Sequence, residues 1–275
     1  MTVRALVTGA SSGLGEQFAR LLAAEGYQIH LVGRDSARLA AVGQVCGELS
    51  GEPAVMSRVD LDEEESLYGF CRRVAADPPD FLVNCAGIAR APLFWEDSDK
   101  AQRELLTVNY FAPNCLIRAV LPALMAKGEG DILNVASVDG LVPGDPDMGY
   151  AASKAALVSL TRSLSIQLAG TGVRVSATCP GFVPTRIHET AGLGKVTLPW
   201  FLWRSADTVA ADALRRHRRG QVVNVPSASY RAIYRAYRLV PARWSAAVVR
   251  AFHSGSIEQP TGVPADGRGG TPVRP

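Results

Sequence analysis

Hydrophobic positions along the chain alternate between two patterns. Short apolar runs of strand length are followed by longer segments in which apolar residues recur at helical spacing. The strand-like runs lie at 5–7, 29–32, 54–56, 81–83, 131–135 and 174–178, with a last candidate at 221–226. The helical segments lie at 13–26, 35–50, 62–76, 98–126, 149–170 and 207–218. Buried strands that alternate with helices predict βαβ units, and therefore an α/β fold with one doubly wound parallel sheet covered by helices on both faces.

The pattern changes near the C-terminal end. Residues 1–226 have the length and apolar content of a single domain. Residues 227–253 are basic and amphipathic, and Pro241 is expected to divide this helical extension into two. Residues 254–275 are rich in glycine and proline and poor in core-forming residues, which predicts a disordered tail.

Positive charge is concentrated near the C-terminal end of the chain. The whole chain carries a net charge of +3, yet residues 204–250 hold ten arginines against only Asp207 and Asp212. The rest of the surface is therefore net acidic, which argues against a nucleic-acid-binding protein. A basic, aromatic helix is instead compatible with peripheral membrane contact through 228–252, with covering the site, or with docking on an acidic partner.

Composition excludes several other classes of protein. There is no run of eighteen apolar residues and no signal-peptide pattern at the start, so we expect neither a spanning helix nor secretion. Five scattered cysteines without a metal-type spacing favour a reducing cytoplasm and no metal site. The four histidines are equally dispersed and are expected to be packing or surface residues.

A glycine-rich turn joins the first strand to the first helix. It reads Thr8-Gly9-Ala10-Ser11-Ser12-Gly13-Leu14-Gly15. Glycines allow the backbone to approach a pyrophosphate closely, and the following helix supplies free N–H groups and a favourable dipole. The turn could also be merely structural, but its position between a strand and a helix is the one that phosphate binding requires. It predicts a dinucleotide site in a Rossmann-type sheet.

A second motif supplies groups that can transfer a proton. Tyr150 and Lys154 are four residues apart, so a helix would place phenol and ammonium on one face. A nearby cation favours phenolate, which predicts a lowered pKa for Tyr150 and a role as proton donor and acceptor near neutral pH. Taken alone, the pair could arise by chance. Ser137 and Asn109 precede it in the chain.

With the glycine spacing, this group of residues resembles the short-chain dehydrogenase/reductase family. Two further elements carry the resemblance, and they are Asn84-Cys85-Ala86-Gly87 and Pro180-Gly181-Phe182-Val183-Pro184-Thr185. The resemblance covers residues 2–226, and Cys85 replaces an asparagine that is usual in the family. The basic extension is similar to that of the branch related to hydroxysteroid and long-chain ketoacyl reductases.

The resemblance implies a role for each motif. Tyr150 would be the general acid in ketone reduction and the base in alcohol oxidation, while Lys154 would bind the nicotinamide ribose and lower the Tyr150 pKa. Ser137 would orient the substrate oxygen, and Asn109 would hold a water that links Lys154 to solvent. The expected cofactor-binding residues are Gly9, Ser11, Ser12, Gly13, Leu14, Gly15, Arg34, Asp60, Leu61, Asn84, Ala86, Gly87, Tyr150, Lys154, Pro180, Gly181, Val183 and Thr185.

The end of the second strand predicts which nicotinamide cofactor binds. An acidic residue there would bind the ribose hydroxyls and repel a 2′-phosphate. This chain has Gly33 followed by Arg34, which leaves room and offers a guanidinium, so we expect NADP(H) in preference to NAD(H). Asp35 is expected to cap the next helix. Asp60 could contact adenine with Leu61, cap a helix, or do both.

The substrate is expected to be a bulky, apolar small molecule. Segments 90–95, 139–144 and 186–203 should surround the reacting carbon, and the last contains Leu198, Trp200, Phe201, Leu202 and Trp203. These side chains could equally pack a lid or an oligomer interface. The leading hypothesis is an NADP(H)-dependent ketone reductase or alcohol dehydrogenase, assembled as a homodimer or homotetramer. The alternatives are an epimerase or dehydratase using the same Tyr/Lys pair, or a non-catalytic nucleotide-sensing protein.

Overall fold

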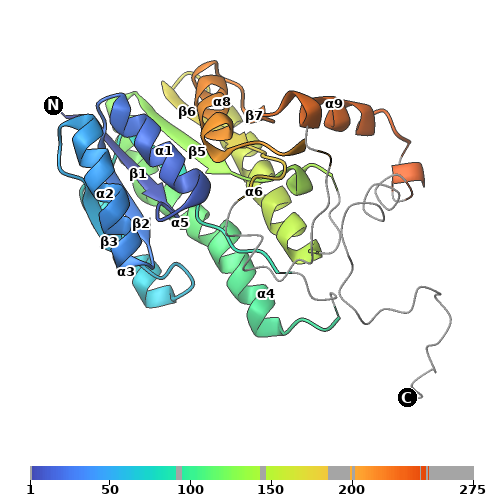
Figure 1. The fold of residues 1–275 in the computed structure, drawn as a ribbon, viewed down its shortest axis with the longest axis horizontal. Helices are drawn as coiled ribbons and strands as arrows, with labels where there is room; N and C mark the ends of the chain where they lie inside the picture. Colours follow the sequence, from blue (N-terminus) through green and yellow to red (C-terminus); the bar gives the residue numbers. More distant parts are fainter. Residues whose placement is uncertain are drawn as a thin grey trace.

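A parallel sheet forms the centre of the molecule (Figure 1). The computed structural model describes residues 2–90, 95–142, 147–184, 199, 202–241, 243–245 and 247. Within these residues, seven parallel strands have the order β3-β2-β1-β4-β5-β6-β7. The strands are β1 (Arg4–Thr8), β2 (Gln28–Gly33), β3 (Val55–Arg58), β4 (Phe81–Asn84), β5 (Gly130–Val135), β6 (Val173–Thr178) and β7 (Val223–Asn224). The predicted fold class is confirmed.

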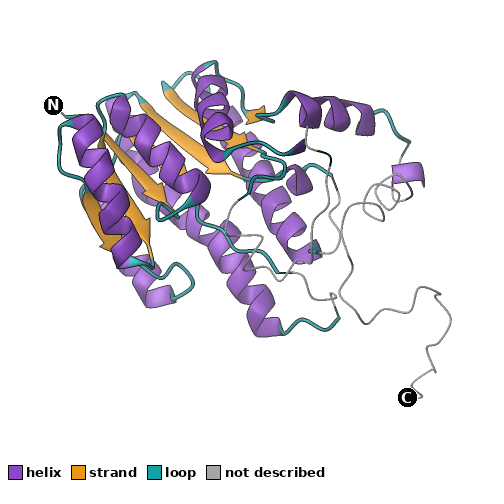
Figure 2. Ribbon diagram, in the orientation of Figure 1, coloured by secondary structure: helices purple, strands orange, loops and turns teal. Residues whose placement is uncertain are grey.

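Helices cover both faces of the sheet (Figure 2). One face packs against α1 (Gly13–Ala24), α2 (Ser36–Ser50) and α8 (Ala206–Arg218). The other packs against α3 (Glu64–Ala76), α5 (Ala112–Lys127) and α6 (Met148–Gln167). Because both faces are covered, strands such as β4 are buried at every residue, which explains their unbroken apolar runs.

One predicted helix, 98–126, is interrupted in the structure. It divides into α4 (Asp99–Leu106), a π-helical turn η1 (Thr107–Phe111) and α5. The wider turn contains Asn109, whose side chain is fully buried and bonded to other parts of the chain. Such π-turns inside helices are frequent at functional sites.

The basic extension begins with α9 (Ala228–Tyr237). Its first turn is part of the domain core, because Tyr230 is 6% exposed and packs with Ala136, Ala177 and Val225. Residues 243–245 are again helical after Pro241, and the predicted disordered tail 254–275 lies outside the described residues. No helix in the described part of the chain is long and apolar enough to cross a membrane.

A buried polar cluster joins β5, β6 and α8 near the amino ends of the strands. His217 Nε2 lies 2.7 Å from Asp131 Oδ1, and His217 Nδ1 lies 2.7 Å from Ser176 Oγ. The guanidinium of Arg174 donates two hydrogen bonds to Asp131. The order Ser–His–Asp is that of a hydrolytic triad, but Ser176 is only 2% exposed and out of reach of a substrate. The cluster therefore holds the sheet and α8 together.

Candidate active site

The expected cofactor residues lie at the carboxyl ends of the strands, where the strand order reverses between β1 and β4. This reversal is the usual place of ligand sites in open parallel sheets. Gly9 and Gly13 adopt positive φ angles of 66° and 61°. A Cβ on Gly9 would stand 2.8 Å from Ala86 Cα, and one on Gly15 would stand 2.2 Å from Gly9 O. Side chains at these positions would push the turn apart.

Ser11, Ser12 and Leu14 complete this turn. Ser12 is the N-cap of α1, and its side chain makes no capping hydrogen bond. The start of α1 therefore keeps N–H groups that its own cap does not use. Ser11 Oγ lies 3.7 Å from the place of a Cβ on Gly33, so the turn borders the end of β2. Leu14 is partly buried and packs against the core beneath.

The element after β4 is fastened to this turn. Thr8 Oγ1 accepts hydrogen bonds of 3.0 Å from the N–H groups of both Cys85 and Ala86. Asn84 donates to Asn134 Oδ1 at 2.9 Å, but its own Oδ1 is buried without a partner in the described structure. An unpaired buried acceptor is costly, and a donor from a bound ligand would satisfy it. Gly87 continues this element and is partly exposed.

The residues after β2 and β3 lie near the same edge. Arg34 is exposed, and Asp35 caps α2 by accepting from Arg38 N at 3.1 Å, which confirms the expected cap. Asp60 is exposed, while Leu61 is buried. The possible helix-capping role of Asp60 is corrected, because α3 begins after Glu63 and the Asp60 carboxylate instead accepts from Asp62 N at 3.2 Å.

Asn109 links three segments of the site. Its Oδ1 accepts from Ile88 N at 2.9 Å, and its Nδ2 donates to Ile88 O at 2.8 Å and to Ser153 Oγ at 3.1 Å. The two bonds to Ile88 match both polar groups of one peptide residue, so Asn109 fixes the segment after β4. Contact with Lys154 through water, which the family resemblance implies, stays a prediction.

Ser137, Asp139 and Tyr150 form a chain of polar groups. Ser137 Oγ donates to Asp139 Oδ2 at 3.1 Å and accepts from Asp139 N at 3.2 Å. The Ser137 hydroxyl also lies near enough to the Tyr150 phenol to lower its pKa. The structure thus brings the two expected substrate-oxygen donors together. The carboxylate of Asp139 lies beside them, in the segment 139–144 that was expected to surround the reacting carbon, although the sequence assigned this carboxylate no role.

The acidity of Tyr150 differs from the expectation of a lowered pKa. Burial raises the pKa of its hydroxyl, the charge of Asp139 raises it further, and Asp147 adds to the effect. The neighbouring Ser137 hydroxyl acts in the opposite direction but is outweighed. Tyr150 is therefore a phenol at neutral pH, and the expectation of a lowered pKa is corrected because it considered Lys154 and neglected burial first of all, and then these carboxylates.

Lys154 is buried beside the ring of Tyr150, on the same face of α6. Its Nζ lies 5.6 Å from the ring centroid and donates to Val135 O at 2.9 Å. Burial lowers the pKa of Lys154 to about 8, although the nearby thiols of Cys85 and Cys179 oppose the shift. The side chain is mostly an ammonium at neutral pH and is held by a backbone carbonyl.

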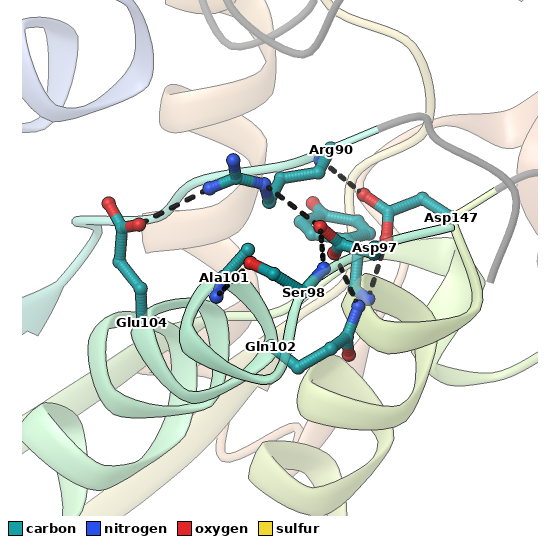
Figure 3. A network of polar contacts seen from close by, with 8 residues as sticks. Arg90, Asp97, Ser98, Ala101, Gln102, Glu104 and Asp147 are labelled. Carbon is teal, nitrogen blue, oxygen red and sulfur yellow. Dashed lines mark hydrogen bonds and ion pairs between the residues drawn. The ribbon is translucent and has the colours of Figure 1, made fainter. Parts of the chain in front are cut away.

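Asp147 fixes the start of the helix that carries Tyr150. It is the N-cap of α6, with Oδ1 accepting from Tyr150 N at 2.8 Å and Oδ2 accepting from Arg90 N at 2.6 Å. Figure 3 shows Arg90 reaching from this point toward Asp97 and Glu104, and its Nη1 donates to Glu104 at 3.2 Å. Burial raises the pKa of Asp147 to about 6. The network fastens the segment after β4 to both α4 and α6.

The turn after β6 closes the other side of the site. Pro180 O accepts from Val138 N at 2.9 Å, Gly181 packs against Tyr230, and Val183 is buried. Thr185 lies outside the described residues, as do Leu198, Trp200 and Phe201. Leu202 is buried, and Trp203 stacks edge-on against Phe182 with ring centroids 6.0 Å apart. These two residues of the expected lid therefore pack against the turn.

Sequence reasoning missed Asp147 and Tyr230 as contributors to the site, and it gave the carboxylate of Asp139 no role. Asp147 had a readable signal, because an aspartate three residues before Tyr150 is a typical N-cap. Asp139 stands two residues after Ser137, within a segment expected to face the substrate. Tyr230 had no local signal, since its partner Gly181 is far away in the chain.

Comparison with known proteins agrees with this geometry. A family model for the short chain dehydrogenase matches residues 3–194. The chain belongs to this family of oxidoreductases. Galactitol 2-dehydrogenase (L-tagatose-forming) of Cereibacter sphaeroides is 37% identical over 186 residues, which are 66% of this chain and 72% of that protein. The family resemblance inferred from the motifs is confirmed.

Solved structures of this family match most of the chain. A short-chain dehydrogenase from Sphingobium yanoikuyae, in complex with NADPH, superposes with a TM-score of 0.78 at 30% identity, covering 95% of this chain and 98% of that one. The bulky-bulky ketone specific alcohol dehydrogenase from Comamonas testosteroni superposes with a TM-score of 0.73 at 25% identity, covering 87% and 95%.

Proposed function

We propose that this short-chain dehydrogenase interconverts a ketone and a secondary alcohol with NADP(H), and that Tyr150 is its proton donor and acceptor. The observation that carries the proposal is the buried Lys154, whose Nζ lies 5.6 Å from the Tyr150 ring centroid, with the Ser137 hydroxyl near the same phenol. Hydride addition to a ketone creates negative charge on its oxygen, and two hydroxyl donors that meet at one point can stabilise it. All three groups come from the ends of β5 and α6, close to the glycine turn.

The residues at the strand ends fit a nicotinamide dinucleotide. Gly9 and Gly15 leave no room for side chains of their own, and the start of α1 has free N–H groups for a pyrophosphate. The unpaired Oδ1 of Asn84 offers an acceptor inside the site. Gly33 and the exposed Arg34 favour a 2′-phosphate, and the Sphingobium relative contains NADPH. When bound, NADP(H) would supply or accept the hydride.

The chain's own residues would handle the proton. Ser137 and Tyr150 would donate hydrogen bonds to the ketone oxygen, and Tyr150 would then transfer its proton to that oxygen as charge develops. The Lys154 ammonium beside the ring would stabilise the resulting phenolate. Because burial and Asp139 raise the pKa of Tyr150, its resting form is the phenol, which has a proton to donate to a ketone oxygen.

The substrate proposed is a bulky, largely apolar ketone. Val138, Leu141, Phe182 and Trp203 are partly buried apolar residues that gather around the turn after β6 and the segment after Ser137. The Comamonas relative is described as specific for ketones with two bulky groups, whereas the Cereibacter relative acts on galactitol. The apolar cluster favours the first of these substrate types.

The experiment that tests this function measures NADPH oxidation by the purified protein with two sets of ketones. Diaryl and alkyl aryl ketones form one set, and L-tagatose represents the polyol-derived ketones. We expect turnover with the bulky set and formation of the secondary alcohol in equal amount. Turnover of L-tagatose alone would contradict the substrate class. Isomerisation without net NADPH consumption would instead indicate an epimerase.

We further propose that the protein is a homodimer or homotetramer. Leu106, Phe111 and Ile166 are large apolar side chains exposed on α4, η1 and α6, where an interface would bury them. Light scattering on the eluting protein should give a mass of two or four chains, and a monomer at micromolar concentration would contradict it. Location in the cytoplasm, expected from the use of cysteine, stays a prediction.

Peripheral membrane contact through 228–252 is a separate proposal. Arg231 does not contribute, because it donates to Val225 O and pairs with Asp212. Leu239 is 84% exposed and Trp244 is 56% exposed, and arginines flank both of them. Replacing these two residues by serine should reduce co-sedimentation with phosphatidylserine vesicles. If the variant and the wild type sediment equally with the vesicles, the proposal is wrong.

A further inference from the structure

The aromatic ring of Tyr230 occupies the space that a side chain on Gly181 would need. A Cβ on Gly181 would stand 2.1 Å from Tyr230 Cε2 and 2.2 Å from Cζ. The Tyr230 hydroxyl accepts a hydrogen bond from Phe182 N at 3.1 Å. The phenol therefore contacts two consecutive residues of the turn after β6, one by packing and one by a hydrogen bond. The first turn of α9 thus supports a loop 48 residues earlier in the chain.

Tyr230 is itself held firmly. It is 6% exposed, and burial raises the pKa of its hydroxyl to about 12, so it stays neutral over the physiological range. The next residue, Arg231, donates to Val225 O at 2.9 Å and lies 3.5 Å from Asp212 Oδ2. The residue after Tyr230 therefore anchors α9 to α8 and to the segment that follows β7. A rigid support of this kind can fix a backbone turn within a narrow range of positions.

The turn is also held from the opposite side. Pro180 O accepts from Val138 N at 2.9 Å, which joins the turn to the segment that follows Ser137. Gly181 and Phe182 therefore lie between the catalytic segment and α9. A shift of this turn would change the wall of the site on the side away from the glycine turn.

We propose that Tyr230 is a positioning residue for NADP(H), acting through the backbone of Gly181 and Phe182. The inference rests on the proposed function, because it assumes that this turn borders the nicotinamide. The first turn of α9, where the basic extension begins, would then belong to the cofactor site. This holds independently of what the rest of the extension binds. Loss of the hydroxyl would remove the hydrogen bond that Phe182 N donates to it, and the turn would be held less firmly.

The test compares Tyr230→Phe with Tyr234→Phe in the full-length protein. Tyr234 lies one turn further along α9 and packs in the same apolar cluster, but its hydroxyl makes no hydrogen bond with another described residue, and only its backbone does. NADPH binding is measured by titration of its fluorescence, without substrate, and folding by thermal unfolding. We expect Tyr230→Phe to weaken NADPH binding by roughly tenfold, which corresponds to ~1.4 kcal/mol. Tyr234→Phe should bind as tightly as wild type.

A second variant approaches the same contact from the turn. Gly181→Ala places a methyl group against the Tyr230 ring, and it should weaken NADPH binding at least as much. At saturating NADPH, kcat of Tyr230→Phe should stay within about twofold of wild type, while KM for NADPH rises. A loss of folded protein would instead lower kcat and leave KM unchanged. Unchanged NADPH binding in either Tyr230→Phe or Gly181→Ala would overturn the positioning role alone. Absence of NADPH binding by wild type would overturn the proposed function as well.

Discussion

Replacing Asp131 by asparagine should destabilise the protein in a way that depends on pH. Burial alone would raise the pKa of Asp131, but the hydrogen bonds from His217 and Arg174 outweigh it and lower the pKa from 3.8 to about 2. A difference of this size corresponds to about 2 kcal/mol of folding free energy at neutral pH. Because the pKa of Asp131 is lower in the folded protein than in the unfolded chain, its contribution to stability is complete at pH values above 3.8. That contribution is lost as the pH falls toward 2.

Urea unfolding of wild type and Asp131→Asn at several pH values measures this contribution. At pH 7 the variant should be less stable by about 2 kcal/mol, and the difference should narrow by about 1 kcal/mol by pH 3. Asp77→Asn is the matched control, since Asp77 pairs with Arg4 at the surface and should contribute less than about 1 kcal/mol. A loss that is the same at all pH values would refute the reasoning. The kcat should not change, because Asp131 lies at the end of β5 opposite to Ser137.

Three further variants test the site. Gly33→Asp has room for its Cβ, which would lie 3.4 Å from Leu39 Cδ2. Its carboxylate should repel the 2′-phosphate and reduce the preference for NADPH over NADH by roughly tenfold or more, measured as the ratio of the two kcat/KM values. Asp139→Asn removes a charge that raises the pKa of Tyr150, so the alkaline limb of the pH profile for ketone reduction should move to lower pH; an unmoved limb would contradict the assignment. Asn109→Ala breaks three hydrogen bonds and should lower stability by about 2 to 4 kcal/mol in urea unfolding; a loss below about 1 kcal/mol would show that these bonds matter little.

Features set by local sequence could be predicted well. The alternation of apolar runs with helical segments was enough to predict the parallel sheet, since its strands are buried on both faces. The glycine turn and the capping of α2 by Asp35 also depend on neighbouring residues only. The four catalytic candidates could be named because their spacing along β5, α6 and η1 resembles that of a known family.

Features that depend on distant partners could not be predicted. The π-turn at Asn109 forms around contacts with Ile88 and Ser153, which no pattern within the helix reveals. The pKa of Tyr150 was expected to fall because only Lys154 was near in sequence, whereas burial and two carboxylates decide its direction. Tyr230 reaches the site only because α9 folds back onto Gly181.

The central claim is that Tyr150 transfers the proton to the substrate oxygen. Tyr150→Phe keeps the ring and its packing beside Lys154 but removes the hydroxyl, which lies near Ser137. The measurement is kcat for ketone reduction at saturating NADPH, together with NADPH affinity in the absence of substrate. The account predicts that kcat falls by about 100-fold or more while NADPH affinity stays within about twofold. A variant that binds NADPH normally and still reduces the ketone at near wild-type rate would contradict it.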